Sequence, residues 1–88
     1  MTGPFVVVGR LEVDRASFDE DQLEHMVSVL RSTPGFVGGT WGRDVADGAV
    51  IHAVVSFATE AHASEFVAGA RAAVPGASFA VVEVLAEA

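Results

Sequence analysis

The order of strand-like and helix-like segments along the chain limits its fold more than any other feature. Segments rich in β-branched residues, which favour strands, occur over Phe5–Val13, Phe36–Val45, Ala49–Phe57 and Ala77–Leu85. Apolar residues at helical spacing predict helices over residues 17–32 and between Thr59 and Pro75. This β-α-β-β-α-β order predicts a ferredoxin-like α+β fold, in which two helices cover one face of a four-stranded antiparallel sheet.

Short local signals mark where several of these elements begin and end. Ser17 and Glu20 have the spacing of a capping box, which predicts the start of the first helix, and Pro34 stops that helix. The Asp47–Gly48 pair predicts a hairpin turn between the second and third strands. The Gly38–Gly39 pair weakens the second strand and indicates a bulge or a close approach of the backbone.

Three of the strands are apolar on both faces. In the first strand, Val6 and Val8 alternate with Phe5 and Val7, so the two pairs lie on opposite faces. The helices can cover only one face, and a chain of 88 residues, interpreted as one domain over residues 1–88, is too small to bury the other. We therefore expect a homodimer of about 18 kDa, twice the 9.1 kDa of the chain, with two sheets facing each other in a dimeric α+β barrel.

The composition argues against several classes of partner. Twelve acidic residues against five arginines, with no lysine, give a net charge of −7, which argues against nucleic acid and against binding to an anionic membrane surface. No apolar run approaches the roughly 18 residues that span a membrane, so we expect no membrane partner. The chain has no cysteine and no recognisable targeting segment, which together favour a cytoplasmic protein.

Two stretches of the chain carry a family likeness. Pro34–Asp44 reads Pro-Gly-Phe-Val-Gly-Gly-Thr-Trp-Gly-Arg-Asp, and Ile51–Phe57 reads Ile-His-Ala-Val-Val-Ser-Phe. Together they resemble the stress-responsive α/β barrel (Dabb) family, most closely over residues 34–67, and more loosely its antibiotic-biosynthesis monooxygenase relatives. The resemblance implies a dimeric α+β barrel, with a ligand cavity between each sheet and its own helices.

The catalytic residues of these families are mostly missing from this chain. The polyketide cyclases among them use a Tyr and a His on the second helix, within a His-Pro-Ala-His-like run. Phe66 stands at the Tyr position, and the run is absent. Glu83 falls where the cyclases carry an Asp on the fourth strand. At the positions of the haem-degrading relatives' Asn and Trp this chain has Gly9 and Phe57, so we expect neither haem nor another cofactor.

His52 is the best candidate for acid–base chemistry, because histidine is the side chain that titrates nearest to neutral pH. The resembling family has six positions from this His to the Phe that ends the strand, whereas this chain has five, from His52 to Phe57. Because strand side chains alternate, the shorter spacing predicts Ile51 on the cavity face and His52 in the dimer seam, unless a bulge intervenes. The alternative role of His52 is that of a hydrogen-bonded interface residue.

The candidate ligand-binding residues are apolar side chains expected on the helix-covered face of the sheet and on the helices. They are Val7, Met26, Leu30, Trp41, Phe57 and Phe66. Trp41 has the alternative role of filling a small core. His52 and Glu83 are the candidate catalytic proton acceptors, provided that either reaches the cavity. The three histidines of the chain lack the spacing of metal ligands, so no metal is expected.

Two further charged groups are interpreted as structural. Arg10 lies in the middle of the first strand, where we expect an ion pair with Glu12 or Glu83. The Arg43–Asp44 pair, beside the Asp47–Gly48 turn, is expected to form the polar shoulder of the hairpin. Its alternative role is that of a rim that orients an anionic ligand.

Two functions are open from the sequence. The first is a small-molecule-binding protein for an apolar aromatic or polyketide-like compound, with or without cofactor-free chemistry of the cyclase or monooxygenase kind. The second is a non-catalytic structural or stress-associated dimer with a filled core. A cavity between the sheet and the helices would favour small-molecule binding. His52 on the wall of that cavity would favour cofactor-free chemistry on the bound molecule.

Overall fold

The structure, a computed structural model, describes residues 4–14 and 19–88. Its elements are β1 (Phe5–Glu12), α1 (Glu20–Arg31), β2 (Phe36–Arg43), β3 (Val50–Phe57), α2 (Glu60–Ala73) and β4 (Ser78–Glu83). This order confirms the predicted ferredoxin-like α+β fold. Neither of the helices in the described part of the chain has the length and apolar character that crossing a membrane requires.

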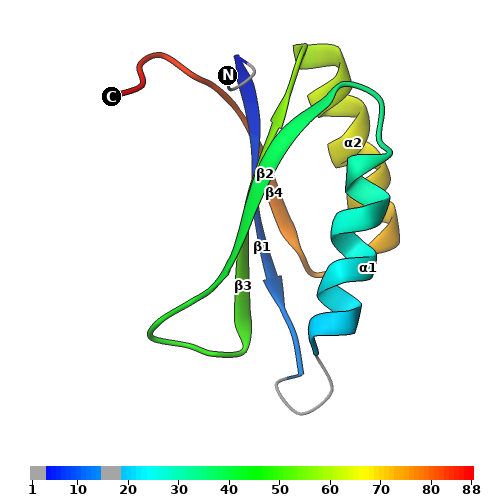
Figure 1. Ribbon diagram of the computed structural model, residues 1–88, viewed down its shortest axis with the longest axis vertical. Coiled ribbons are helices and arrows are strands. Elements are labelled where there is room, and N and C mark those ends of the chain that lie inside the picture. The colour runs from blue at the N-terminus through cyan, green and yellow to red at the C-terminus, as the bar shows by residue number, and fades with distance from the viewer. Residues whose placement is uncertain (1–3, 15–18) are drawn as a thin grey trace.

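The four strands form one antiparallel sheet in the order β2-β3-β1-β4, so that β3 and β1 lie at its centre. Both helices lie on the same face of this sheet, and none of the residues that the structure describes forms a helix on the other face (Figure 1). We call the side that carries Val7 and Ala53 the helix face. The side that carries Val8, His52 and Val54 is the open face.

Side-chain caps explain where the helices begin. α1 begins at Glu20, because Asp19 Oδ1 accepts the Gln22 N–H (3.0 Å) and Gln22 Oε1 accepts the Asp19 N–H (3.3 Å). The predicted capping box at Ser17 is therefore corrected: Glu20 is the first helical residue rather than the third, and Ser17 lies outside the described residues. α2 is capped by Thr59, as predicted.

A bulge in β2 sets the direction of two aromatic side chains. It lies between Phe36 and Gly38, where Val37 is the extra residue, and it confirms the glycine signal in the sequence. In a regular strand Phe36 and Trp41 would lie on opposite faces. Because of the bulge, both rings lie on the helix face and pack against the core.

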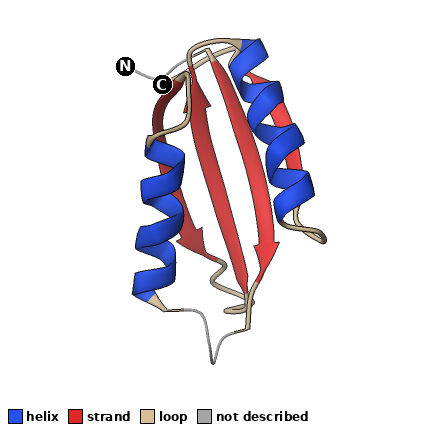
Figure 2. Cartoon of the chain, turned by 90° about the vertical axis from the view of Figure 1, so that its right-hand side faces the viewer, coloured by secondary structure: helices blue, strands red, loops and turns tan. Residues whose placement is uncertain are grey.

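The buried core lies mainly beneath α2. Val7, Val55 and Phe57 of the central strands pack there against Ala63 of α2. α2 packs over β1, β3 and β4, whereas α1 packs chiefly against β2, and Leu30 is its one fully buried residue. The two helices stand apart across the sheet (Figure 2). The helix face is therefore well packed under α2 and less completely covered between the helices.

The open face exposes large apolar side chains. Val8, Val37, Val54 and Val82 are between 41 and 44 % exposed. Val8 and Val54 are direct partners in the pairing of β1 with β3. Partly exposed valines from all four strands therefore lie on the open face.

Candidate functional site

A cavity of about 500 Å³ lies between the helix face of the sheet and the two helices. Pockets of this size hold small organic molecules. Its wall is almost entirely apolar, and all four strands and both helices contribute to it. The helix residues that both line it and are exposed to solvent mark its mouth, and they are His25, Val29, Glu65, Gly69 and Ala73.

The floor of the cavity contains a row of four residues that crosses the sheet, which we call the central row. The strand registers align Trp41 of β2 with Ala53 of β3, Ala53 with Gly9 of β1, and Gly9 with Phe79 of β4. The central strands thus carry the smallest side chains of the row, and the edge strands carry its aromatic rings. The Phe79 ring lies over Gly9, whereas the side chain of Ala53 is a single methyl group, so space remains above Ala53.

Two glycines allow the aromatic rings of the central row to lie close to the sheet. A Cβ atom at Gly9 would come within 3.2 Å of the Phe79 ring, and one at Gly39 within 2.7 Å of the Trp41 ring. Both approaches are closer than ordinary side-chain packing, so another residue at either position would push the ring outward. The two rings therefore form walls of the cavity whose positions depend on these glycines.

Five of the six predicted ligand-binding residues line the cavity. They are Val7, Met26, Leu30, Trp41 and Phe66. The sixth, Phe57, is fully buried in the core and does not form part of the cavity wall. Its ring is covered by the ring of Phe66, so a ligand in the cavity would touch Phe66 and not Phe57.

Three phenylalanines, Phe57, Phe66 and Phe79, form an aromatic cluster on the α2 side of the cavity. The ring centroids of Phe57 and Phe66 lie 5.2 Å apart, and Phe66 meets Phe79 edge-on at 6.4 Å. Both separations are within the range of favourable ring pairs. Trp41 has no such ring partner among residues 4–14 and 19–88, although it lines the cavity.

His52 lies on the open face, away from the cavity. β3 pairs with β1 without a register shift, so its side chains alternate, and Ile51 and Ala53 line the cavity while His52 lies on the opposite side. The five-residue spacing to Phe57 predicts this placement for a strand without a bulge. The bulge that could have changed it lies in β2 instead.

Glu83, the second candidate proton acceptor, is far from His52. Glu83 pairs with Phe5 at the start of β1, whereas His52 pairs with Arg10 near its end. Phe5 and Arg10 are an odd number of residues apart, so Glu83 and His52 lie on opposite faces of the sheet. Glu83 is exposed and does not line the cavity. Neither predicted proton acceptor therefore reaches the cavity wall.

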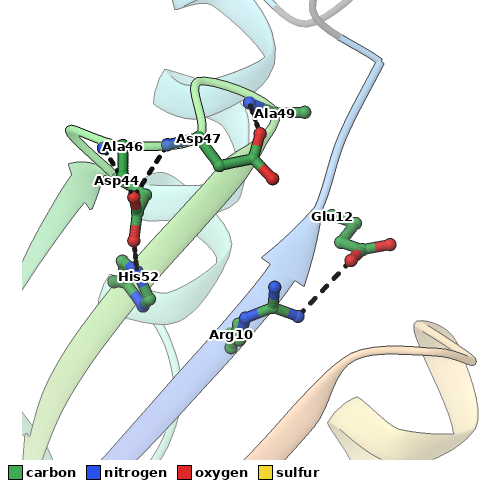
Figure 3. A network of polar contacts seen from close by, with 7 residues as sticks. All are labelled: Arg10, Glu12, Asp44, Ala46, Asp47, Ala49 and His52. Atoms are coloured by element: carbon green, nitrogen blue, oxygen red, sulfur yellow. Dashed lines mark hydrogen bonds and ion pairs between the residues drawn. The ribbon is translucent and has the colours of Figure 1, made fainter.

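His52 belongs to a polar network at the β2–β3 turn (Figure 3). Its Nε2–H donates to Asp44 Oδ2 at 2.7 Å, while Asp44 Oδ1 accepts the backbone N–H groups of Ala46 (2.8 Å) and Asp47 (2.9 Å). These bonds, that from His52 foremost, stabilise the carboxylate and hold the pKa of Asp44 below its ordinary value. The predicted polar shoulder of the hairpin is present, and its aspartate fixes the orientation of the imidazole.

Two arginines complete the polar end of the sheet. Arg43 Nη1 donates to the Gly48 carbonyl at 2.6 Å, which closes the turn. Arg10 Nη1 lies 3.5 Å from Glu12 Oε1, one of the two partners expected for it. Within residues 4–14 and 19–88, no three His, Asp or Glu side chains are grouped so as to hold a metal ion.

The central row could not be predicted from the sequence alone. Gly9, Ala53 and Phe79 lie in three different strands, and glycine and alanine carry no chemistry of their own. The signal that could have revealed them is the antiparallel register, which brings the three positions side by side. His25 is exposed and lies at the mouth of the cavity.

The comparisons with known proteins add no relative. No family model matches the chain, and no curated protein matches it. The resemblance to the stress-responsive α/β barrel family therefore stays a prediction from the sequence, and the cavity carries the functional conclusion.

Proposed function

We propose that this protein binds a small apolar molecule in the cavity between its sheet and its helices. The observation that carries the proposal is about 500 Å³ of space lined by apolar side chains in a chain of only 88 residues. The cavity opens to solvent at its mouth, and apolar surface that stays in contact with water lacks the stabilisation that burial would give. A bound apolar ligand would fill this space and would bury its own surface.

The lining favours an uncharged ligand. Of the lining residues, His25, Thr33 and Glu65 carry polar side chains on the helix side. Arg10 also contributes to the lining, but its guanidinium is paired with Glu12. Burying an unpaired charge in such a wall would be costly, and the net charge of −7 further disfavours an anion.

The proposal is for binding without turnover. Cofactor-free chemistry of the cyclase or monooxygenase kind would need an acid or a base beside the ligand. His52 and Glu83 both lie away from the cavity wall. Among the described lining residues, the imidazole belongs to His25 and the carboxylate to Glu65, and both side chains lie at the mouth, where they are exposed to water.

The open face supports a second proposal, that two copies of the chain associate through it as a dimeric α+β barrel. Val8, Val54 and Val82 are exposed there, and apolar patches of this kind mark interaction surfaces. Such a dimer without a ligand would be the structural or stress-associated protein that the sequence leaves open.

We also propose a cytoplasmic location, because the chain has no cysteine that could form a disulfide.

Fluorescence from Trp41 tests the binding proposal, because Trp41 is the only tryptophan of the chain and lines the cavity. Titration with N-phenyl-1-naphthylamine, an apolar dye, is expected to quench Trp41 by energy transfer in a saturable manner. Ala70→Phe, which fills the cavity, should weaken dye binding by about tenfold. Ala72→Phe on the exposed side of the same helix is the matched control and should leave it unchanged. Absence of saturable quenching, or equal weakening by both variants, would overturn the proposal.

A further inference from the structure

We infer that the space above the central row is a slot for flat, fused aromatic rings, and that Ala53 sets this selectivity. Such ligands would occupy the cavity of the proposed binding function, on which their recognition depends. In the central row Ala53 lies next to Trp41 on one side and, on the other side, next to Gly9, over which the ring of Phe79 lies. A ligand that enters the cavity as far as the sheet therefore meets a small-residue floor with aromatic walls.

The slot is one residue row wide. The row on one side of it pairs Val7 with Val55, and the row on the other side pairs Leu11 with Ile51. All four of these branched side chains line the cavity. Residues on the same face of a strand are about 6.7 Å apart, so the branched side chains rise close to both sides of the small pair. A slot of this shape admits a thin, flat ring more readily than a buckled one.

The walls of the slot offer ring partners to an aromatic ligand. Phe79 already packs edge-on against Phe66 at 6.4 Å. Trp41 lines the cavity and makes no ring pair within residues 4–14 and 19–88. A fused ring above Ala53 would lie between Trp41 and Phe79 and would supply the missing partner. Each ring pair should favour an aromatic ligand by about two- to tenfold in Kd.

Ala53 is the position at which the slot can be closed with least disturbance to the fold. It is half-buried on the central strand β3, and valine is well suited to strands. A Cβ atom at Gly9 would lie 3.9 Å from the Ala53 methyl, an ordinary van der Waals contact, so the two positions are direct neighbours on the helix face. Substitution of Gly9 itself would also displace the Phe79 ring, which lies 3.2 Å from such a Cβ.

Two alcohols, 2-naphthol and decahydro-2-naphthol, provide the test, because they share one carbon skeleton and only the first is flat and aromatic. Their Kd values are measured by displacement of N-phenyl-1-naphthylamine from the full chain. The wild-type protein should bind 2-naphthol about tenfold more tightly than its saturated analogue. Ala53→Val should reduce this preference to about threefold or less by weakening 2-naphthol alone.

Ala80→Val is the matched control, because Ala80 is exposed on β4 and pairs with Val8 of the open face. It should retain the full preference. Trp41→Leu provides a second variant, which keeps an apolar wall but removes the free ring, and it should lower the preference to a similar extent as Ala53→Val. Far-ultraviolet circular dichroism checks that each variant keeps its sheet.

The possible failures are distinguishable. Equal wild-type affinity for the two alcohols would overturn the slot while the binding function stands. Retention of the preference in both Ala53→Val and Trp41→Leu, or its equal loss in Ala80→Val, would also overturn the assignment. If neither the dye nor either alcohol binds the wild-type protein, the proposed function itself fails.

Discussion

Asp44 shows how much one side chain fixes at the β2–β3 turn. One carboxylate oxygen accepts two backbone N–H groups of the turn, and the other accepts the imidazole N–H of His52. Because all three bonds favour the charged form, the pKa of Asp44 lies below its ordinary value. The turn and the orientation of His52 therefore depend on the same ionised group.

This lowered pKa predicts how the stability of the protein responds to acid. An aspartate whose folded pKa is below its unfolded value of about 3.9 contributes stability that is present above that value and is lost as the pH falls through the folded pKa. Asp44→Asn should therefore destabilise the protein at pH 7. The difference from wild type should shrink as the pH falls below about 4. Urea unfolding over a pH series measures this, and a difference that does not change with pH would contradict the account.

For single residues, the sequence predicts which face of the sheet a side chain occupies better than it predicts which residues lie beside it. The spacing from His52 to Phe57 predicts that Ile51 faces the cavity and His52 does not, and the structure agrees. The turn aspartate could be predicted from its neighbours in sequence. The role of Ala53 could not be predicted, because it depends on the residues that the strand pairing places beside Ala53.

The bulge in β2 is the decisive feature at the scale of single elements. By inserting Val37, it lets Phe36 and Trp41 share the helix face although an odd number of residues separates them. Without the bulge, one of the two rings would lie on the open face, and if that ring were Trp41 the cavity would lack one wall. The position of the bulge therefore decides whether the cavity has an aromatic residue on the β2 side.

Deletion of Val37 tests this role. Without the extra residue, regular alternation should move either Phe36 or Trp41 off the helix face, with a loss of about 3 kcal/mol of stability, comparable to truncation of a core aromatic residue. Thermal unfolding and the wavelength of Trp41 emission measure both effects. Val37→Thr keeps the chain length and serves as the control. A deletion variant with wild-type stability and emission would show that the bulge has no such role.

The elements differ in how far the sequence determines them. The order of the six elements and the Thr59 cap of α2 follow from local patterns and are confirmed. The start of α1 does not follow from the local pattern, because two pairs of residues near it have capping-box spacing, Ser17 with Glu20 and Asp19 with Gln22. In the structure the second pair caps the helix, and nothing in the local pattern ranks one above the other.

At the scale of the whole molecule, the two faces of the sheet have different roles in our account. The helix face carries the cavity, while the open face carries partly exposed valines and the His52–Asp44 pair. The alternation of apolar residues on both faces could be predicted from the sequence. The separation of the two helices (Figure 2) could not be predicted, because it depends on how α1 and α2 pack on different strands. The cavity is lined by residues of both helices and of the sheet.

Val54→Asp tests the proposed association through the open face. Val54 is 44 % exposed at the centre of that face, and a charge there would be buried in a dimer seam at a cost of several kcal/mol. Light scattering should report a wild-type dimer of about 18 kDa, twice the 9.1 kDa chain, and a monomeric variant. Val45→Asp, at a fully exposed position in the turn, is the matched control. A wild-type monomer at micromolar concentration would contradict the dimer, and an unchanged Val54→Asp dimer would contradict the choice of face.

Methyl NMR with 2-naphthol shows whether the cavity binds an apolar molecule and where the molecule lies. Met26, Leu30 and Ala53 place methyl groups in the cavity lining, whereas Val8 and Val54 report on the open face. We predict saturable shifts of the first three residues, with Val8 and Val54 unmoved. Shifts confined to the two open-face valines, or no saturable shift at any of the five, would contradict the account.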